Sequence, residues 1–223
     1  MARIERKDAE AIFGADVLET SLDLLDGSAE LVRVDAGETF IRQDDPCQHA
    51  FALTRGAVKL LRTTEGVPRL LDVARGPVLV ADAALFDGGP WSASVVALRA
   101  SSVLRFSRDA LLEASTQDPH LTRTLRAAAA RTVRAMVMRI DTLAAGTVEI
   151  RLMRFFDDLA ARYGTPMGNA RFIALPLRRH EIASLVGAEA ETVSRLMARW
   201  TREGTLRASR DGILWSRGTV LAR

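Results

Sequence analysis

The segment between residues 178 and 200 holds the side chains best suited to chemistry, and that chemistry is hydrogen bonding to base pairs. Glu191 and Arg195 are four positions apart, so a helix would place them on one face. Arginine can donate two hydrogen bonds to O6 and N7 of guanine, and glutamate can accept one from N4 of cytosine. The alternative interpretation is a surface ion pair, which stabilises a fold by only about 0.2–1 kcal/mol. The spacing of the residues around the pair favours base recognition.

Those surrounding residues have the spacing of a helix-turn-helix. Ala183 is small where two helices would cross, and Gly187, four residues later, permits the positive φ of a tight turn. Val193, six residues further along, would anchor the second helix in the core. We expect that second helix to expose the following side chains to DNA: Ala190, Glu191, Ser194, Arg195 and Arg199.

Two short segments after this motif, Thr205–Ala208 and Gly212–Ser216, are separated by a turn at residues 209–211. Short strands joined by such a turn predict a wing, so the whole module is read as a winged helix-turn-helix. Arg207 and Arg210 would then be available to the phosphates of the DNA backbone. Contacts of that kind position a protein on the duplex without reading its sequence.

Charge is distributed unevenly along the 223 residues, whose net charge is +3. Residues 147–223 hold 13 arginines against 8 acidic residues, or +5, which leaves −2 for residues 1–146. A basic C-terminal part suggests a polyanionic partner, although a solvated basic surface would have the same composition. Of the 31 basic residues 29 are arginine, a side chain that suits bidentate recognition of phosphate and guanine.

The part of the chain before this module begins with a short helical stretch within residues 1–30 and continues with short apolar segments up to residue 108. Many short strands at close spacing, separated by glycine-containing turns, predict a β-sandwich or barrel. The predicted strand segments are Leu31–Val34, Thr39–Ile41, Phe51–Leu53, Val58–Leu61, Leu70–Val73, Val95–Leu98 and Val103–Phe106.

Residues 118–144 predict one long helix, with Asp118 as its N-cap, Pro119 at its first position and Gly146 as a hinge beyond its end. Apolar residues recur in it at steps of three or four. This stripe has two interpretations, packing of the helix on its own domain or a dimerisation seam of coiled-coil type, and we favour the seam. The predicted interface residues are Leu121, Leu125, Ala128, Thr132, Met136, Ile140 and Leu143.

Composition and motifs exclude several other classes of protein. The single cysteine, Cys47, rules out internal disulfides and any multi-cysteine iron–sulfur or zinc site. No apolar run approaches the roughly 20 residues of a membrane span, and residues 1–8 lack the apolar core of a signal peptide, so we expect a cytoplasmic protein. The three histidines are scattered, and P-loop, dinucleotide and HExxH motifs are absent from the sequence, which argues against an enzyme.

Taken in order, these blocks resemble the Crp/Fnr family of bacterial transcription regulators over nearly the whole chain. The resemblance implies an α+β fold with a jelly-roll-like β-roll sensor domain (1–117), a dimerisation helix and hinge (118–146) and a winged helix-turn-helix domain (147–223). It also implies a homodimer that binds and bends a palindromic site, with RNA polymerase as a further partner. The matching motifs lie at residues 36–39, 56–59, 85–90, 92–94, 118–119, 175–177, 181–183 and 191–195.

Within the recognition helix, Glu191, Ser194 and Arg195 look like the anaerobic-regulator branch of that family, whose half-site is TTGAT-like. Ala190 stands where the cyclic-AMP branch has an arginine, so one base contact would be absent. We therefore expect a TTG…CAA core to be read. His180 sits where family members often place a phosphate-contacting polar residue, and Arg179 beside it joins the expected DNA-binding set.

The effector pocket is where the family pattern fails. Cyclic-nucleotide members hold the ribose with a Gly-Glu pair and the phosphate with an Arg-Ser pair, and these positions look like Ala81-Asp82 and Trp91-Ser92 here. The Thr-Ser pair that meets the base aligns with Met136-Val137. Loss of the arginine removes the charged partner of a phosphate, and Trp91 adds bulk. The resemblance therefore predicts that no cyclic nucleotide binds.

Three possibilities for the signal remain: an apolar or aromatic effector lined by Trp91, Met136 and Val137; haem, for which Cys47 and His49 are potential ligands; or no effector. The haem ligands rest on weak evidence, so we expect no cofactor and no metal. A regulatory module that binds a cyclic nucleotide but not DNA is the alternative class. It would have no use for a basic helix-turn-helix, and salt-dependent binding to duplex DNA distinguishes the two.

Overall fold

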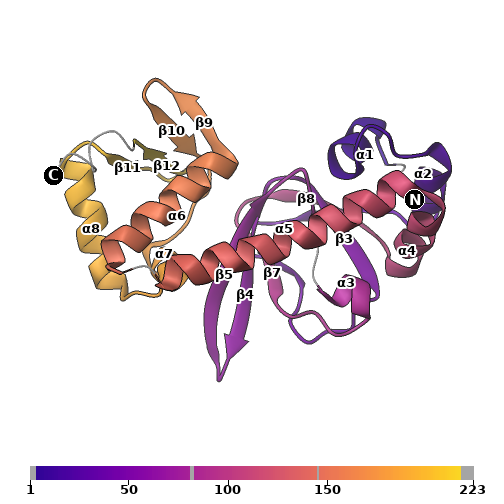
Figure 1. Ribbon diagram of the computed structural model, residues 1–223, viewed down its shortest axis with the longest axis horizontal. Helices are drawn as coiled ribbons and strands as arrows, with labels where there is room; N and C mark the ends of the chain where they lie inside the picture. The colour runs from indigo at the N-terminus through magenta and orange to yellow at the C-terminus, as the bar shows by residue number, and fades with distance from the viewer. Residues whose placement is uncertain (1–3, 81–82, 145, 217–223) are drawn as a thin grey trace. The chain divides into compact units, whose positions relative to one another are not determined.

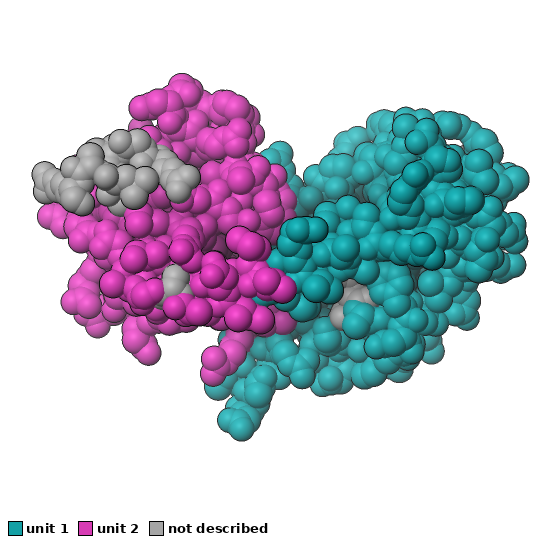
Figure 2. Space-filling view, in the orientation of Figure 1, with its two compact units in different colours: residues 1–68, 72–136 teal, residues 69–71, 137–223 magenta. Residues whose placement is uncertain are grey.

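The computed structural model describes residues 4–80, 83–144 and 146–216 (Figure 1). By its internal contacts the chain separates into two units, one of residues 1–68 and 72–136 and one of residues 69–71 and 137–223 (Figure 2). Both units combine helices and strands, which confirms the predicted α+β class. No helix in the described ranges is both long and apolar enough to cross a membrane.

Two four-stranded antiparallel sheets form the body of the first unit. The first has the order β1-β8-β3-β6 and the second the order β2-β7-β4-β5. A short helix, α3 (Ala83–Asp87), lies between β6 and β7 in the sequence. The strands are β1 (Glu30–Val34), β2 (Thr39–Ile41), β3 (His49–Arg55), β4 (Ala57–Thr64), β5 (Val67–Arg75), β6 (Val78–Val80), β7 (Ser94–Ala97) and β8 (Ser101–Ser107).

Successive side chains of each strand point to opposite faces of the first sheet, so the sheet contributes residues to two separate cores. On β3, Phe51 and Leu53 enter a core that also holds Val58 and Val95 of the second sheet, and this core lies between the sheets. Ala52, between them in sequence, faces the opposite side, which is covered mainly by the helices near the two ends of this unit. Those helices are α1 (Arg6–Phe13), α2 (Glu19–Asp26), α4 (Arg108–Gln117) and the first half of α5 (Pro119–Ala144).

Asp118, between α4 and α5, is the N-cap that the sequence predicts. Its Oδ1 accepts hydrogen bonds from the backbone N–H groups of His120 (2.8 Å) and Leu121 (3.1 Å), two of the first N–H groups of α5. Its Oδ2 accepts from the Leu18 N–H (2.9 Å) and from Ser21 Oγ (3.0 Å) at the start of α2. One fully buried carboxylate therefore joins two helices distant in sequence.

The apolar residues of α5 form two faces, which corrects the single predicted seam. Leu121, Leu125 and Ala128 are buried in the core of the first unit, so these three side chains are not available to a second chain. At about 100° per residue, the later apolar residues lie roughly 90° further round the helix. That later face is exposed in the structure and consists of Val133, Met136, Val137 and Ile140.

The second unit is a small helical domain with a four-stranded antiparallel sheet of order β11-β12-β10-β9. Phe156, Trp200 and Trp215 form its aromatic centre, with ring centroids 5.3–6.3 Å apart. The predicted wing is present. The elements are α6 (Val148–Tyr163), β9 (Gly164–Met167), β10 (Ala170–Ile173), α7 (Arg179–Val186), α8 (Ala190–Arg202), β11 (Leu206–Ala208) and β12 (Ile213–Trp215).

Candidate nucleic-acid interface

Helices α7 and α8 form the helix-turn-helix that the spacing predicts, and Gly187 makes the turn. Its φ is +59°, in the left-handed region that favours glycine. The N–H of Ala188 returns to the carbonyl of Ala183 at 3.0 Å, which closes the end of α7. A Cβ at Gly187 would lie 2.9 Å from Leu143 Cδ2, so the end of that leucine side chain would have to move aside.

The start of α7 is capped by an acidic residue inside the helix. The carboxylate of Glu181 accepts a hydrogen bond from the backbone N–H of Arg178 at 2.7 Å. An arginine side chain has no acceptor atom, so Arg178 cannot supply the side-chain cap that serine, threonine or aspartate provides. Glu181 is buried beneath the turn, and the guanidinium of Arg178 remains at the surface.

Helix α8 has one buried and one exposed face, as a recognition helix requires. Val193, Met197 and Trp200 are buried in the core of the domain. The opposite face exposes Glu191 and Arg195, with Ala190 exposed at the first position of the helix and Ser194 half-buried. Arg195 Nη2 lies 3.4 Å from Thr192 Oγ1 on its own helix. The predicted base-reading side chains therefore lie on one accessible surface.

Arg199, also predicted to contact DNA, has other partners in the structure. Its guanidinium forms an ion pair with Glu149 at the start of α6, and its Nε lies 3.8 Å from a carboxylate oxygen of Glu203. Two acidic neighbours compensate its charge. We therefore assign Arg199 to the packing of α8 against α6 and leave it out of the base-reading set.

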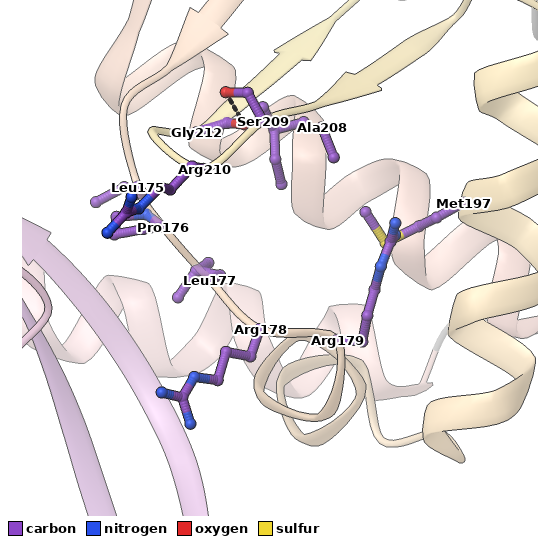
Figure 3. Close-up of a pocket in the computed structure, with 11 residues that line it drawn as sticks. Leu175, Pro176, Leu177, Arg178, Arg179, Met197, Ala208, Ser209, Arg210 and Gly212 are labelled. Atoms are coloured by element: carbon purple, nitrogen blue, oxygen red, sulfur yellow. Dashed lines mark hydrogen bonds between the residues drawn. The ribbon is translucent and has the colours of Figure 1, made fainter.

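A pocket of about 210 Å³ lies between the start of α7, helix α8 and the wing (Figure 3). Apolar residues, among them Leu177, Met197 and Ile213, form part of its lining, and three arginines carry its charge. In Figure 3 the side chain of Arg179 extends toward Met197, whereas that of Arg178 points away from it. Burial lowers the pKa of Arg179, yet arginine remains a cation at neutral pH. The pocket is therefore basic.

The remaining predicted DNA-binding residues lie at the surface around this pocket. His180 is exposed in the first turn of α7, Arg207 is exposed on β11, and Arg210 is exposed in the wing turn and lines the pocket. The turn is closed by Ser209, whose backbone N–H and Oγ both donate to the carbonyl of Gly212, at 2.8 and 3.0 Å. The wing thereby presents Arg210 from a fixed loop.

The four described residues of the expected effector pocket differ in exposure. Trp91 is 3% exposed and packs in the core between the sheets, its ring centroid 6.0 Å from that of Phe51. Ser92 is exposed, and its carbonyl accepts a hydrogen bond from Arg62. Met136 and Val137 are exposed on α5. Ala81 and Asp82, the other two expected residues, lie outside the described residues.

Cys47 and His49, the two potential haem ligands of the sequence, each contact other groups of the first unit. Cys47 is buried and its Sγ donates to the carbonyl of His49 at 3.7 Å, while the His49 ring packs near Phe51 with the centroids 6.4 Å apart. Across residues 4–80, 83–144 and 146–216, no group of three His, Cys, Asp or Glu side chains is placed to hold a metal ion.

A winged helix-turn-helix with an accessible basic surface, in one chain with a double-sheet domain, defines a DNA-binding regulator. Two family models match the chain: the cyclic nucleotide-binding domain over residues 31–118 and the Crp-like helix-turn-helix domain over residues 150–217. The chain is also 30% identical over 179 residues to the transcriptional regulatory protein btr of Bordetella pertussis, which covers 80% of this chain and 74% of that protein.

Other relatives agree with these matches. The CRP-like cAMP-activated global transcriptional regulator of Mycobacterium tuberculosis is 28% identical, over 84% of each chain. The solved structure of FixK2 from Bradyrhizobium japonicum superposes with a TM-score of 0.73 at 22% identity, over 85% of this chain and 93% of that one, a likeness of fold. The chain belongs to the Crp/Fnr family of transcription regulators, and it is a DNA-binding regulator, not an enzyme.

Proposed function

We propose that this regulator binds DNA as a homodimer on a palindromic site with a TTG…CAA core. The observation that carries the proposal is the exposed face of α8, where Glu191 and Arg195 lie beside Ser194. Arginine would donate to guanine O6 and N7, and glutamate would accept from cytosine N4, so the two side chains read the G·C pair of each half-site. Ala190 leaves the flanking base pair unread.

The second chain would bind on the exposed apolar face of α5. Val133, Met136, Val137 and Ile140 are each more than half exposed, and a contiguous apolar surface of this kind marks an interaction site. Their steps of three or four match a helix-to-helix seam. Two identical chains related by a two-fold axis present two recognition helices, and such a dimer requires a palindromic site. Thr132, half-buried, and Leu143 flank the seam.

Phosphate contacts would come from the pocket beside the wing and its rim. Arg179 and Arg210 line the pocket, and His180 and Arg207 lie close by at the surface. These contacts would fix the register of α8 in the major groove without reading sequence. A protein that binds DNA in a bacterium would be located in the cytoplasm. The resemblance to the family also implies RNA polymerase as a partner.

We further propose that cyclic AMP does not control this protein. The Mycobacterium tuberculosis relative is named as cAMP-activated, and this property is that of the relative. By resemblance to the family, Trp91 stands at the position of the phosphate-binding arginine, so the charged partner of a cyclic phosphate would be missing. Trp91 is buried in this structure. Haem and an apolar effector are the alternatives, and neither has a specific observation in its favour.

The test of the whole proposal is duplex binding as a function of salt. The full chain should bind a palindromic TTG…CAA duplex more tightly than a scrambled duplex, with two chains per duplex. The logarithm of its affinity should fall linearly with the logarithm of salt concentration, because each neutralised phosphate releases counterions. Equal affinity for both duplexes would refute the half-site, and a stoichiometry of one chain would refute the dimer.

A further inference from the structure

Arg151, in the first turn of α6, binds three backbone carbonyls with its guanidinium. Its Nε donates to the carbonyl of Val186 at 2.7 Å and its Nη2 to that of Gly187 at 3.0 Å. Its Nη1 donates to the carbonyl of Gly146, between α5 and α6, at 3.1 Å. The last carbonyls of a helix have no partners within the helix, so Arg151 supplies partners to the end of α7 and holds the segment before α6 to the same point.

The turn held by Arg151 leads directly into the recognition helix. Gly187 is three residues before Ala190, the first residue of α8, and four before Glu191 on the exposed face. Leu143, in the last turn of α5, lies against the same glycine, since an added Cβ there would be 2.9 Å from its Cδ2. The end of α5 and the start of α6 therefore both contact Gly187, the residue of the turn from which α8 begins.

The far end of α8 is also held by α6. Glu149, two residues before Arg151, forms an ion pair with Arg199 in the last turn of α8. The first turn of α6 thus contacts the turn before the recognition helix through Arg151, and the last turn of that helix through Glu149. Both residues belong to α6 and not to the helix that carries Arg195, so we expect them to affect DNA recognition through the placement of α8.

We propose that Arg151 is a positioning residue for DNA recognition, because it fixes the turn from which α8 emerges and joins that turn to Gly146. The proposal rests on the base-reading role proposed for α8. Base contacts tolerate errors of only about 0.5 Å in the placement of a side chain, whereas phosphate attraction is far less directional. Loss of Arg151 should therefore weaken sequence recognition and leave the sequence-independent affinity in place.

The experiment compares Arg151→Gln with Arg162→Gln in the full chain. Both substitutions remove one positive charge from α6, but Arg162 is paired with Asp158 in the last turns of that helix. The wild-type protein first selects its preferred duplex from a random pool, so the test does not depend on the TTG…CAA core. Affinities for that duplex and for a scrambled one are then measured across salt concentrations, with thermal unfolding as the check on folding.

We expect Arg151→Gln to reduce the ratio of specific to non-specific affinity about tenfold, the effect of losing a charged hydrogen bond. The affinity of Arg151→Gln for the scrambled duplex should stay within about twofold of the affinity of Arg162→Gln for the same duplex, since both variants lose one positive charge. An unchanged ratio, or an equal loss on both duplexes, would overturn the proposal. If Arg151→Gln fails to fold, Arg151→Lys decides: its ammonium has three donors on a shorter stem, and the ratio should fall to an intermediate value. A wild-type ratio in Arg151→Lys would contradict the proposal.

Discussion

The carboxylate of Asp118 accepts a hydrogen bond from Ser21 Oγ at 3.0 Å, across 97 residues of sequence. The same carboxylate caps α5 through His120 and Leu121 and binds the N–H of Leu18. Burial raises the pKa of Asp118, but the hydrogen bonds from these four donors outweigh it and hold the pKa below its usual value of 3.8. The charged form is thus the one that the fold stabilises.

Asp118→Asn should therefore lower the free energy of unfolding at pH 7 by about 2–4 kcal/mol, because a neutral amide cannot satisfy all four donors. A group with a depressed folded pKa contributes stability above its unfolded pKa and loses it as the pH falls through the folded pKa. The difference between wild type and variant should then be constant from neutral pH to about pH 5 and shrink below about pH 4. Urea unfolding across this range measures it, and a difference that grows toward acid pH would contradict the account.

The exposed face of α5 gives a prediction about assembly. Ile140→Asp should convert the proposed dimer to monomers of 24.3 kDa, because it places a charge in an apolar seam. The matched control is Met138→Asp, since Met138 is similarly exposed (57%, against 68% for Ile140) but lies roughly 160° round the helix. Sedimentation equilibrium measures the masses. If Met138→Asp were monomeric and Ile140→Asp remained dimeric, the dimer seam would lie on another face of α5.

Trp91 gives a prediction about the effector. Calorimetric titration of the purified protein with cyclic AMP should show no binding tighter than about 1 mM, roughly −4 kcal/mol, because the tryptophan is packed where a charged partner would be needed. Trp91→Ala should destabilise the first unit by about 3–5 kcal/mol through the cavity it leaves. Micromolar binding by the wild type would refute the proposal. A Soret band in its absorption spectrum would instead indicate haem.

Gly187 gives a prediction about the turn. Gly187→Ala should destabilise the second unit by about 1–2 kcal/mol, because the residue has a positive φ and little room for a Cβ. Gly168→Ala is the control, since Gly168 also has a positive φ but nothing lies within 4 Å of an added Cβ. The excess loss in Gly187→Ala measures the contact with Leu143. Equal losses in guanidinium unfolding would show that the contact contributes nothing.

The DNA-binding module was predictable from sequence because its determinants are local. Ala183, Gly187 and Val193 are spaced by the geometry of two helices and one turn, and a wing is two strands joined by a short loop. The same holds for Asp118 as a helix cap. In each case residues close in sequence are also close in space, so periodicity and turn chemistry suffice.

Features that depend on tertiary packing were not predictable. The seven strands predicted between residues 31 and 106 all overlap observed ones, but β6 in the same part of the chain, only three residues long, was missed. The apolar residues of α5 recur at helical spacing whether they pack in the core of their own chain or are exposed. The sequence therefore could not show that Leu121 is buried and Ile140 is exposed. The role of Arg151 could not be predicted from the sequence. It is one of 29 arginines, and its three carbonyl partners lie outside its own helix.

The central claim is that Arg195 reads a base, and a panel of duplexes tests it most directly. Affinities of wild type, Arg195→Ala and Arg202→Ala are measured on the TTG…CAA palindrome and on versions with each G·C pair replaced. Arg202, exposed at the end of α8, controls for loss of one charge. The account predicts that Arg195→Ala costs about 1–3 kcal/mol per half-site on the palindrome and no longer distinguishes the replaced pair. An Arg195→Ala protein that keeps the full preference for TTG…CAA would contradict it.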